Sequence, residues 1–525
     1  MSTYSQTMEM REPVLASPGV SSLAAMLVPS LGAAVFAVAL VHVLFLSAGT
    51  RTLFRDSDTG WHIRNGEAML RTGSVPRIDG FSYTAAGKEW LSWEWASDVA
   101  LGAAHRWGGP AGVAFVAALA IALAAWGAVR LSLALGGNLL FTAVAAGLLL
   151  GSTSIHWLAR PHVFSWLISL AFLAVAEQER RGLFLRGVLR GRRALYWLPA
   201  LACLWANLHG SFLLGPAILA VYAIGEWLQE LQDGAGAFRP GPAARRFALA
   251  GVASLAATFV NPYGWKLHAH VIAYLRDSYL MDHILEFRSF DFHSPGAIYV
   301  ELFLGVAAAG TVAMIRQRAY GPALLSVAML HLSFYSARHL PTSAVLLLPL
   351  SVAALTREAQ CWPGLRAFFG YSERLSAIDA KVSGVALVAL VLAGTLGTLA
   401  TQAHADRVGF DPAMFPVKAA DFLEQQGLDR RVFAKDQWGG YLIYRFDGRM
   451  QIFLDGRSDH YGRELLQTYA KVIDVKPGWD AVLRQYGVQF VLAPPEHALA
   501  SVLALSPEWK RVYTDSVATV FERIG

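Results

Sequence analysis

The sequence predicts a mainly α-helical membrane protein, in which a bundle of about eleven transmembrane helices precedes a soluble α/β domain. Of its 525 residues 55% are hydrophobic and only 16% are charged, and the mean hydropathy is +0.41. Soluble proteins average about 25% charged residues, so this composition belongs in a membrane. From about Asp411 the composition changes to that of a soluble domain. We therefore expect a transmembrane domain over residues 1–402 and an extracytoplasmic α/β domain over residues 403–525.

The first apolar segment, residues 22–48, lies in a stretch without charge between Glu12 and Arg51. It exceeds the about 20 residues that a helix needs to cross a bilayer, and it is too long for a signal-peptide core, so we expect an uncleaved anchor. Ten further apolar stretches follow, at about 111–129, 138–158, 162–176, 195–209, 211–228, 247–262, 296–315, 322–337, 340–356 and 383–402.

The uninterrupted stretch 194–225 is long enough to be read as one helix or as two. As one helix it would be about 48 Å long, whereas the hydrocarbon core is about 30 Å thick. We therefore predict two helices that turn at Asn207-Leu-His-Gly210.

Basic residues concentrate in three short loops, which indicates that these loops are cytoplasmic. They are Arg180, Arg181, Arg186, Arg190, Arg192 and Arg193 in one loop, Arg239, Arg245 and Arg246 in the second, and Arg316 and Arg318 in the third. The helix count then places the N-terminus inside, and the first loop, residues 49–98, outside with the C-terminal domain. The formal charge of +6 is explained by these loops, so we expect no nucleic-acid partner.

With this topology, six polar motifs fall at the outer face. Ionisable residues at membrane depth are costly and mark function or paired structure. The motifs are Asp56-Ser-Asp58, Arg160-Pro-His162, Asn207-Leu-His209, Asn261-Pro-Tyr263, Glu286-Phe-Arg288 and Arg338-His339. Their convergence on one face predicts a single site.

The carboxylates of Asp56 and Asp58 are the first candidates for chemistry at this site. In a loop both can turn toward one cation or one hydroxyl, whereas on a regular helix they would diverge. Asp56 would act as general base on an acceptor hydroxyl, and Asp58 would assist it or ligate a divalent cation, Mg²⁺ or Mn²⁺. The alternative is an ordinary solvated pair or a helix cap.

Cationic and polar side chains supply the rest of the predicted site. Arg160, Arg338 and His339 are candidates for binding an anionic phosphate, because a guanidinium binds phosphate oxygens bidentately; a lipid-contacting arginine is the alternative. The candidate substrate-binding residues are His62, His162, Asn207, His209 and Glu286. Simple hydrogen-bonding at a helix end is the alternative for His162 and His209, a helix-end break for Asn207, and an exposed loop residue for Glu286. The tryptophans of the first loop, at positions 61, 90, 93 and 95, favour a membrane-interface belt, with sugar stacking as the alternative.

Several motifs resemble a bacterial family of GT-C-type polytopic membrane proteins whose members are largely uncharacterised. They extend over most of the chain: Asp56-x-Asp58-x-x-Trp61-His62, Val75-Pro76-x-x-Asp79-x-Phe81-Ser82-Tyr83, Trp205-Ala-Asn207-Leu-His209-Gly210, Asn261-Pro-Tyr263-Gly264, Trp438-Gly-Gly-Tyr441 and Asp455-Gly-Arg457. GT-C enzymes move a sugar from a polyprenyl-phosphate carrier to an acceptor at the outer side of the membrane. The resemblance implies that Asp56 matches the acidic residue of the first outer loop. It further implies a bacterial inner membrane, a periplasmic C-terminal domain, and a lipid, glycan or protein acceptor.

The C-terminal region alternates helical and strand patterns, which favours a small α/β sandwich. We expect helices at 417–427, 462–473 and 479–486, and strands at 431–434, 451–454 and 488–492, with a strand pair over 511–521. The Trp438-Gly-Gly-Tyr441 and Asp455-Gly-Arg457 segments then fall where strands end, and glycine turns explain them. This domain would help to form the acceptor cleft.

The leading hypothesis is therefore a membrane glycosyltransferase that uses a polyprenyl-phosphate sugar. A polymerase or ligase of lipid-linked oligosaccharides is the second enzymatic alternative. A transporter or a non-catalytic envelope assembly protein is the third, although internal repeats typical of transporters are not evident.

Overall fold

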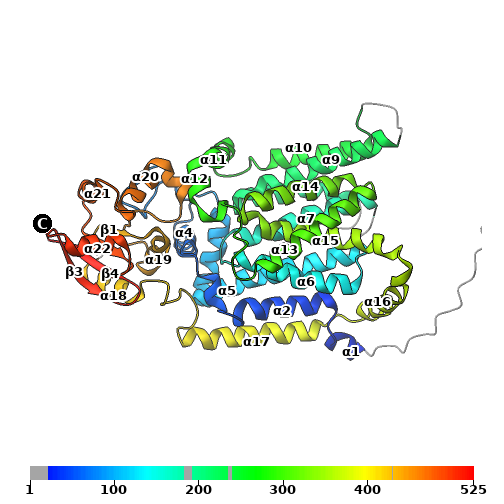
Figure 1. Ribbon diagram of the computed structural model, residues 1–525, viewed down its shortest axis with the longest axis horizontal. Helices are drawn as coiled ribbons and strands as arrows, with labels where there is room; N and C mark the ends of the chain where they lie inside the picture. The colour runs from blue at the N-terminus through cyan, green and yellow to red at the C-terminus, as the bar shows by residue number, and fades with distance from the viewer. Residues whose placement is uncertain (1–21, 183–191, 234–238, 428–429, 525) are drawn as a thin grey trace, which may run out of the picture.

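The computed structural model describes residues 22–182, 192–233, 239–427 and 430–524. Figure 1 shows a bundle of near-parallel helices with a small sheet at one end of it. Seven of the described helices are long and apolar enough to cross a membrane. The protein is thus a multi-pass membrane protein with a C-terminal α/β region, and the predicted fold class is confirmed.

Every predicted apolar stretch contains a helix. These helices are α2 (Leu31–Phe45), α5 (Trp95–Ala134), α6 (Leu139–Thr153), α7 (His162–Arg181), α8 (Leu198–Leu208), α9 (Leu214–Gln232), α10 (Pro242–Ala257), α13 (Ala297–Arg316), α14 (Tyr320–Tyr335), α15 (Leu340–Gln360) and α17 (Val385–His404). Shorter elements connect them: α1 (Ser22–Leu27), α3 (Thr50–Leu53), η1 (Ser154–His156), η2 (Arg192–Trp197), α11 (Trp265–Arg276), α12 (Ser278–His283), η4 (Leu285–Phe287), η5 (Ala337–His339), η6 (Pro363–Leu365) and α16 (Arg366–Asp379).

The stretch 194–225 forms two helices, as predicted. α8 ends at Leu208, His209 is extended, and the short helix η3 (Gly210–Leu213) leads into α9. This break leaves the Asn207 and His209 side chains at the end of the bundle nearer the C-terminal sheet (Figure 1).

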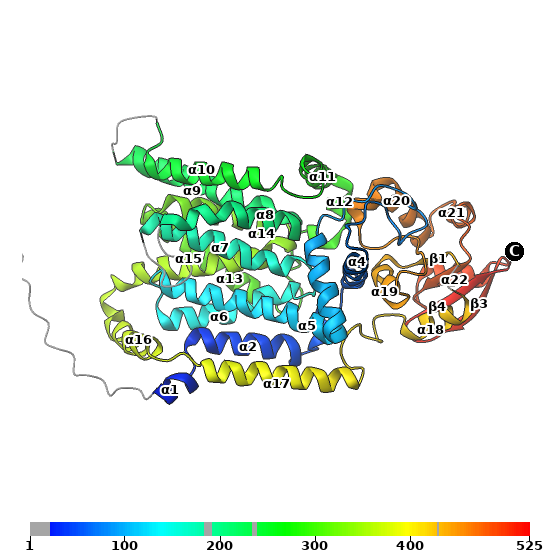
Figure 2. The same ribbon diagram turned by 180° about the vertical axis from the view of Figure 1, so that it is seen from behind.

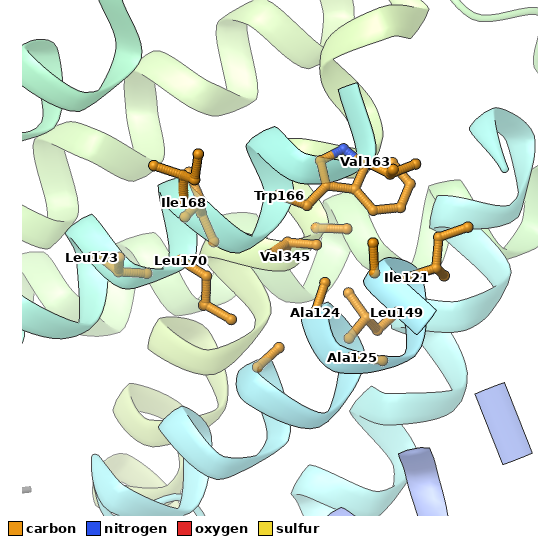
Figure 3. Packing of buried hydrophobic residues seen from close by; sticks show 14 of the residues in the cluster. Ile121, Ala124, Ala125, Leu149, Val163, Trp166, Ile168, Leu170, Leu173 and Val345 are labelled. Carbon is orange, nitrogen blue, oxygen red and sulfur yellow. The ribbon is translucent and has the colours of Figure 1, made fainter. Parts of the chain in front are cut away.

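The bundle core is built on α15 and α5. Within the apolar window of α15, 83% of the residues are buried, whereas in α17 only 11% are. Figure 3 shows why α5 packs centrally: small side chains such as Ala124 and Ala125 face Val345 and Trp166 of neighbouring helices. Alanine lets helices approach closely, which is how membrane helices gain van der Waals contact.

The first outer loop is more helical than predicted. Residues 58–72 form α4 (Asp58–Thr72), and α5 begins at Trp95 with a break at Gly108 and Gly109 before Pro110. α4 lies across the end of the bundle, together with the part of α5 that precedes this break. Both lie between the bundle and the C-terminal elements (Figure 1). The sequence predicted residues 49–98 as a loop, because the polar residues of α4 obscure its helical pattern.

The C-terminal sheet has the order β1-β2-β4-β3, in which β1 and β2 are parallel and the remaining pairs are antiparallel. Its strands are β1 (Val432–Ala434), β2 (Phe490–Ala493), β3 (Trp509–Thr514) and β4 (Thr519–Arg523), and its helices are α18 (Val417–Gln426), α19 (Asp436–Arg445), α20 (Ser458–Ile473), α21 (Trp479–Gln485) and α22 (Ala498–Leu505). β1 and β2 are buried at every position, as their unbroken apolar sequences require.

Two C-terminal predictions are wrong. Residues 451–454 are not a strand; Ile452 forms only isolated bridges, to Ser82 and to Val432. Trp438-Gly-Gly-Tyr441 is not a turn but lies inside α19, where the glycines permit close packing. A Cβ on Gly440 would collide with the Ser57 backbone, and a Cβ on Gly60 would collide with Gly440. These glycines let α19 contact the start of α4.

The first loop and the C-terminal region also share a hydrophobic core. Trp61 and Trp90 are buried in one cluster with Trp438, Tyr441 and other C-terminal side chains. Trp93 packs edge-on against His270 and Tyr274, and the Trp95 indole N–H donates to Asn207. The predicted interface belt is therefore wrong for the buried Trp61 and Trp90, and it stays a prediction for the half-buried Trp93 and Trp95.

The two ends of the bundle differ in charge. α7 begins at His162, next to the outer motifs, and ends about 30 Å away at Arg180 and Arg181. In Figure 2 the same end of the bundle, remote from the sheet, carries the start of α10, where Arg245 and Arg246 lie. Arg186 and Arg190 fall outside the described residues. The orientation relative to the cytoplasm remains a prediction.

Candidate active site

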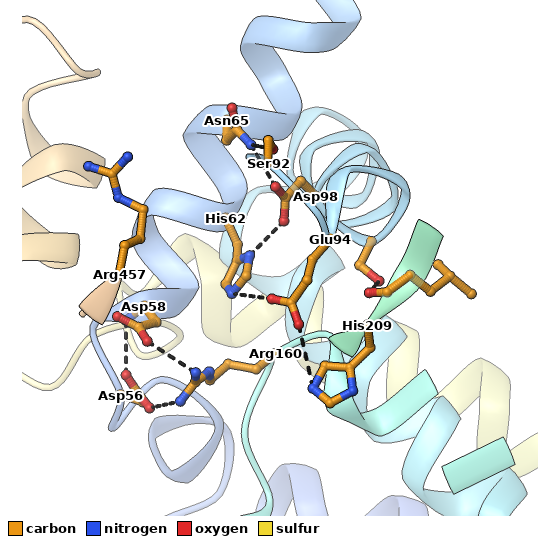
Figure 4. Close-up of polar contacts among 12 residues, drawn as sticks. Asp56, Asp58, His62, Asn65, Ser92, Glu94, Asp98, Arg160, His209 and Arg457 are labelled. Carbon is orange, nitrogen blue, oxygen red and sulfur yellow. Dashed lines mark hydrogen bonds and ion pairs between the residues drawn. The ribbon is translucent and has the colours of Figure 1, made fainter. Parts of the chain in front are cut away.

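Asp56 and Asp58 converge on one guanidinium, that of Arg160 (Figure 4). Arg160 Nη1 lies 2.6 Å from Asp56 Oδ2, and its Nη2 lies 3.1 Å from Asp58 Oδ2. The arginine comes from the loop between η1 and α7, about a hundred residues from the carboxylates in sequence. The structure thus brings together three residues that the sequence singled out separately.

Local backbone geometry holds the pair of carboxylates. Asp56 precedes α4, and its Oδ1 accepts the N–H of Asp58, the first residue of the helix, at 3.0 Å. The cap residue of α4 is Ser57, so Asp56 is not the helix cap. Its second oxygen, Oδ2, contacts Arg160. Gly456 leaves room for Asp58, since a Cβ there would collide with the Asp58 carboxylate.

The electrostatics of the pair are asymmetric. Burial and the neighbouring Asp56 charge raise the pKa of Asp58 to about 8, although Arg160 opposes this shift. Asp56 is the more exposed of the two, with 27% of its side chain accessible against 10% for Asp58. Near neutral pH Asp58 therefore holds its proton more readily than an ordinary aspartate does.

A second cation, Arg338, lies beside this group. It donates to Glu286 Oε1 at 2.7 Å and lies 5.1 Å from the centre of the Phe287 ring. Glu286 Oε2 is 3.7 Å from Arg160, so this carboxylate links the two arginines. Burial opposes ionisation of Glu286, but Arg338 and Arg160 outweigh it and lower its pKa to about 2.

These groups line one cavity of about 910 Å³ between the bundle and the C-terminal region. Its walls also include His209, His339, Trp93, Tyr274, Asp436, Asp455, Asp459 and Tyr469. Apolar side chains of α12, η4 and α14, among them Leu280, Leu285 and Leu332, line its membrane side. The cavity therefore joins an apolar wall, a cationic pair and several carboxylates.

The predicted substrate-binding residues fall into two groups. Glu286 and His209 line the cavity, and His62 is fully buried beneath it, 2.6 Å from Asp98. Burial lowers the pKa of His62 to about 3, so it is neutral near pH 7.

His162 and Asn207 lie outside the cavity lining. His162 is hydrogen-bonded to the His156 carbonyl, and Asn207 donates to the carbonyls of Cys203 and Val260. These contacts match the alternative of helix-end hydrogen bonding.

Sequence reasoning missed several site residues. Glu94 and Asp98 line the cavity. Glu94 sits in the Trp93-Glu94-Trp95 segment, where the tryptophans drew attention to the membrane interface, and Asp98 follows in the first turn of α5. Asp79 was also missed. It binds the buried Arg457, which in turn is bound by Asp455 at 2.7–2.8 Å. The Asp455-Gly-Arg457 motif was the available signal, because an arginine between two acidic positions suggests a buried ion pair.

The described residues contain no group of three or more His, Cys, Asp or Glu arranged to hold a metal ion. Asp58, the predicted ligand, faces the Arg160 guanidinium, which lies where a cation shared with Asp56 would bind. The residues in this arrangement therefore do not fit a divalent metal.

The fold is similar to that of solved GT-C-type membrane enzymes. The oligosaccharyltransferase of Archaeoglobus fulgidus superimposes with a TM-score of 0.55 at 13% identity in the apo form. As AglB in complex with an inhibitory peptide and a dolichol-phosphate it gives a TM-score of 0.56 at 12% identity. Both matches cover 90% of this chain and 70% of the archaeal chain. Apo ArnT from Cupriavidus metallidurans gives a TM-score of 0.50 at 17% identity, over 93% of this chain and 97% of ArnT.

No family model matches the sequence, and no curated protein matches it. The structural likenesses nevertheless define the class by fold: the chain has the architecture of GT-C-type polytopic membrane glycosyltransferases. The resemblance seen in the sequence motifs is confirmed at this level.

Proposed function

We propose that this protein is a membrane glycosyltransferase that transfers a sugar from a polyprenyl-phosphate donor to an acceptor at the outer face of the bacterial inner membrane. The observation that carries the proposal is the single cavity in which the Asp56–Asp58 pair lies beside Arg160 and Arg338. The fold adds support, because AglB has been solved in complex with a dolichol-phosphate.

The donor phosphate would bind at Arg338, His339 and Arg160. A guanidinium binds phosphate oxygens bidentately and stabilises the negative charge that grows on the leaving group as the bond to the sugar breaks. The apolar wall of α12 and α14 lies next to these cations and would receive the first isoprene units. Glu286 keeps Arg338 aligned in the absence of the phosphate.

The acceptor would be activated at the carboxylates. Asp56 is the candidate general base, because it is the more exposed of the pair and its Oδ1 is fixed by the Asp58 N–H. Asp58 and Arg160 position it. The acceptor, whether lipid, glycan or protein, would enter from the C-terminal side, where Asp436, Asp459 and Tyr469 line the cavity.

A divalent cation remains a prediction for this site, and we derive no step from it. A third structure of the archaeal oligosaccharyltransferase is a complex with Zn and sulfate. Sugar transfer measured with a chelator, and again after addition of Mg²⁺ or Mn²⁺, tests the prediction. Loss and recovery of transfer would show that the reaction needs a divalent cation.

Mass spectrometry of envelope glycans and lipid-linked sugars tests the proposed function. A strain lacking the gene is complemented with wild type, with Asp56→Asn or with the control Asp282→Asn, an exposed aspartate of α12. We expect the deletion to remove one sugar from a glycan and to accumulate its lipid-linked donor, and only wild type and the control to restore the profile.

The other outcomes separate the alternatives. Loss of a repeating oligosaccharide rather than one sugar would favour the polymerase or ligase. An unchanged glycan profile would favour transport or assembly, and full restoration by Asp56→Asn would reject Asp56 as the base.

A further inference from the structure

Glu94, at the start of α5, lies between two histidines on the wall of the cavity (Figure 4). Its Oε2 is 3.9 Å from His62 Nε2, and its Oε1 is 3.5 Å from His209 Nε2. The two imidazoles come from different elements, α4 and the break between α8 and α9, and each is anchored through its other nitrogen.

The contacts of His62 define where its hydrogen lies. Its Nδ1 is 2.6 Å from Asp98 Oδ1, and the second oxygen of Asp98 accepts from Asn65 at 2.6 Å. Burial raises the pKa of Asp98. When Asp98 is ionised it accepts from the imidazole, which then carries its hydrogen on Nδ1 and has a lone pair on Nε2. That Nε2 atom is buried and has no hydrogen-bond partner among the described residues. It faces Glu94 and needs a donor.

His209 has the opposite arrangement. The backbone N–H of Ser211 donates to its Nδ1 at 3.2 Å, so the lone pair lies on Nδ1 and the hydrogen on Nε2. This Nε2–H faces Glu94 Oε1 and can donate to it. One oxygen of Glu94 therefore meets a donor, and the other meets an acceptor.

This environment suits a carboxyl group that gains and loses one proton. We propose that Glu94 is a second proton-accepting group of the cavity, which takes up the proton that the acceptor's hydroxyl or amino group loses during sugar transfer. Ionised Glu94 accepts from His209; once protonated on Oε2, it also donates to His62. The inference rests on the proposed function, which supplies the proton.

The bond changes balance without a further reactant. The acceptor's O–H or N–H bond breaks, its lone pair bonds to the sugar carbon, and the bond from that carbon to phosphate oxygen breaks with its electron pair leaving on the phosphate. The proton leaves through Asp56 and cavity water and forms the Oε2–H bond of Glu94. Asp56 and Asp58 are each bound by Arg160, whereas the ion-pair contacts of Glu94 in the described chain are to the two histidines.

The surrounding charges keep Glu94 responsive near neutral pH. Burial raises the pKa of Glu94 to about 7; the Asp98 charge adds to this shift, while His62, Arg160 and Arg338 oppose it. His209 faces the same carboxyl group from the α8–α9 break. A general base is most effective when its pKa lies near the working pH.

Infrared titration of the full-length protein in lipid nanodiscs tests the proton site without using activity. We expect wild type to show a protonated-carboxyl band that disappears as the pH rises through about 7, and Glu94→Gln to lack this component. The control Glu89→Gln, an exposed residue paired with Lys266, should keep it, and Asp58→Asn should remove only a component that titrates at higher pH. An identical titration in Glu94→Gln and wild type would overturn the proposal.

The pH profile of sugar transfer tests the role of this site in the reaction. Transfer by wild type should fall as the pH drops below about 7, because Glu94 is then already protonated; Glu94→Gln should transfer about 100-fold more slowly above this pH and lose the step in the profile. A profile of unchanged shape and height in Glu94→Gln would overturn the role. A titrating Glu94 in a protein that transfers no sugar would overturn the proposed function and the source of the proton, but not the proton site.

Discussion

Gly440 of α19 lies against the start of α4, at the contact that brings the C-terminal region to the carboxylate pair. A Cβ at this position would lie 2.7 Å from the Ser57 carbonyl carbon and 3.2 Å from the Asp58 nitrogen, whereas ordinary contacts begin at 3.4 Å. Because both opposing atoms are backbone, one helix must move by about 1 Å in Gly440→Ala, and such overpacking costs about 1–3 kcal/mol. The higher helix propensity of alanine returns about 1 kcal/mol.

We therefore expect Gly440→Ala to lower the free energy of unfolding by up to about 2 kcal/mol. The effect on sugar transfer should be larger, about 100-fold, because a displacement of about 1 Å at a reacting group costs this much. Thermal unfolding followed by tryptophan fluorescence, together with product formation, measures both quantities.

Gly370→Ala in α16 is the matched control, since a Cβ there meets nothing within 4 Å. It should leave transfer unchanged and should not lower the unfolding temperature. The reasoning would be refuted if Gly440→Ala unfolded and transferred sugar like wild type, because the contact between α4 and α19 would then not position the site.

Three further predictions follow from the ion pairs. Arg338→Gln should weaken binding of a polyprenyl phosphate about 10- to 100-fold, the value of a charge-assisted hydrogen bond, with no effect on binding of the neutral polyprenol in a lipid-exchange assay. Arg457→Gln leaves two buried carboxylates without their cation and should destabilise the protein by about 3–5 kcal/mol, seen as early loss of the C-terminal region in hydrogen exchange. The pKa of Glu286 is lowered from 4.5 to about 2, so its ionised carboxylate stabilises the folded protein above pH 4.5, and this stabilisation is lost as the pH falls toward 2. In acid unfolding, Glu286→Gln should therefore lose less stability than wild type over this range.

The membrane bundle was predictable because its signal is strong and local. Long apolar stretches and clustered arginines located the helices, and the length limit on 194–225 correctly required a break near His209. α19 was not predictable from the same rules, since a Gly-Gly pair favours a turn when its packing partner is unknown. The approach of Ser57 explains why residue 440 is glycine, and the approach of Leu454 and Asp455 explains why residue 439 is glycine.

The site was predictable in part. The six polar motifs identified Asp56, Arg160, Glu286 and Arg338, which the structure brings into one cavity. Glu94 was missed, because nothing in Trp93-Glu94-Trp95 indicates that two histidines from distant elements face this carboxylate. Such a contact depends on tertiary packing, which local sequence patterns do not report.

The most direct test of the account uses purified protein in nanodiscs and the lipid-linked sugars that accumulate in the deletion strain. Mass spectrometry would follow release of polyprenyl phosphate and appearance of the glycosylated acceptor. The account predicts that wild type releases polyprenyl phosphate in step with sugar transfer, whereas Asp56→Asn does not. Wild type that leaves every accumulated lipid-linked sugar intact in the presence of envelope acceptors would contradict it.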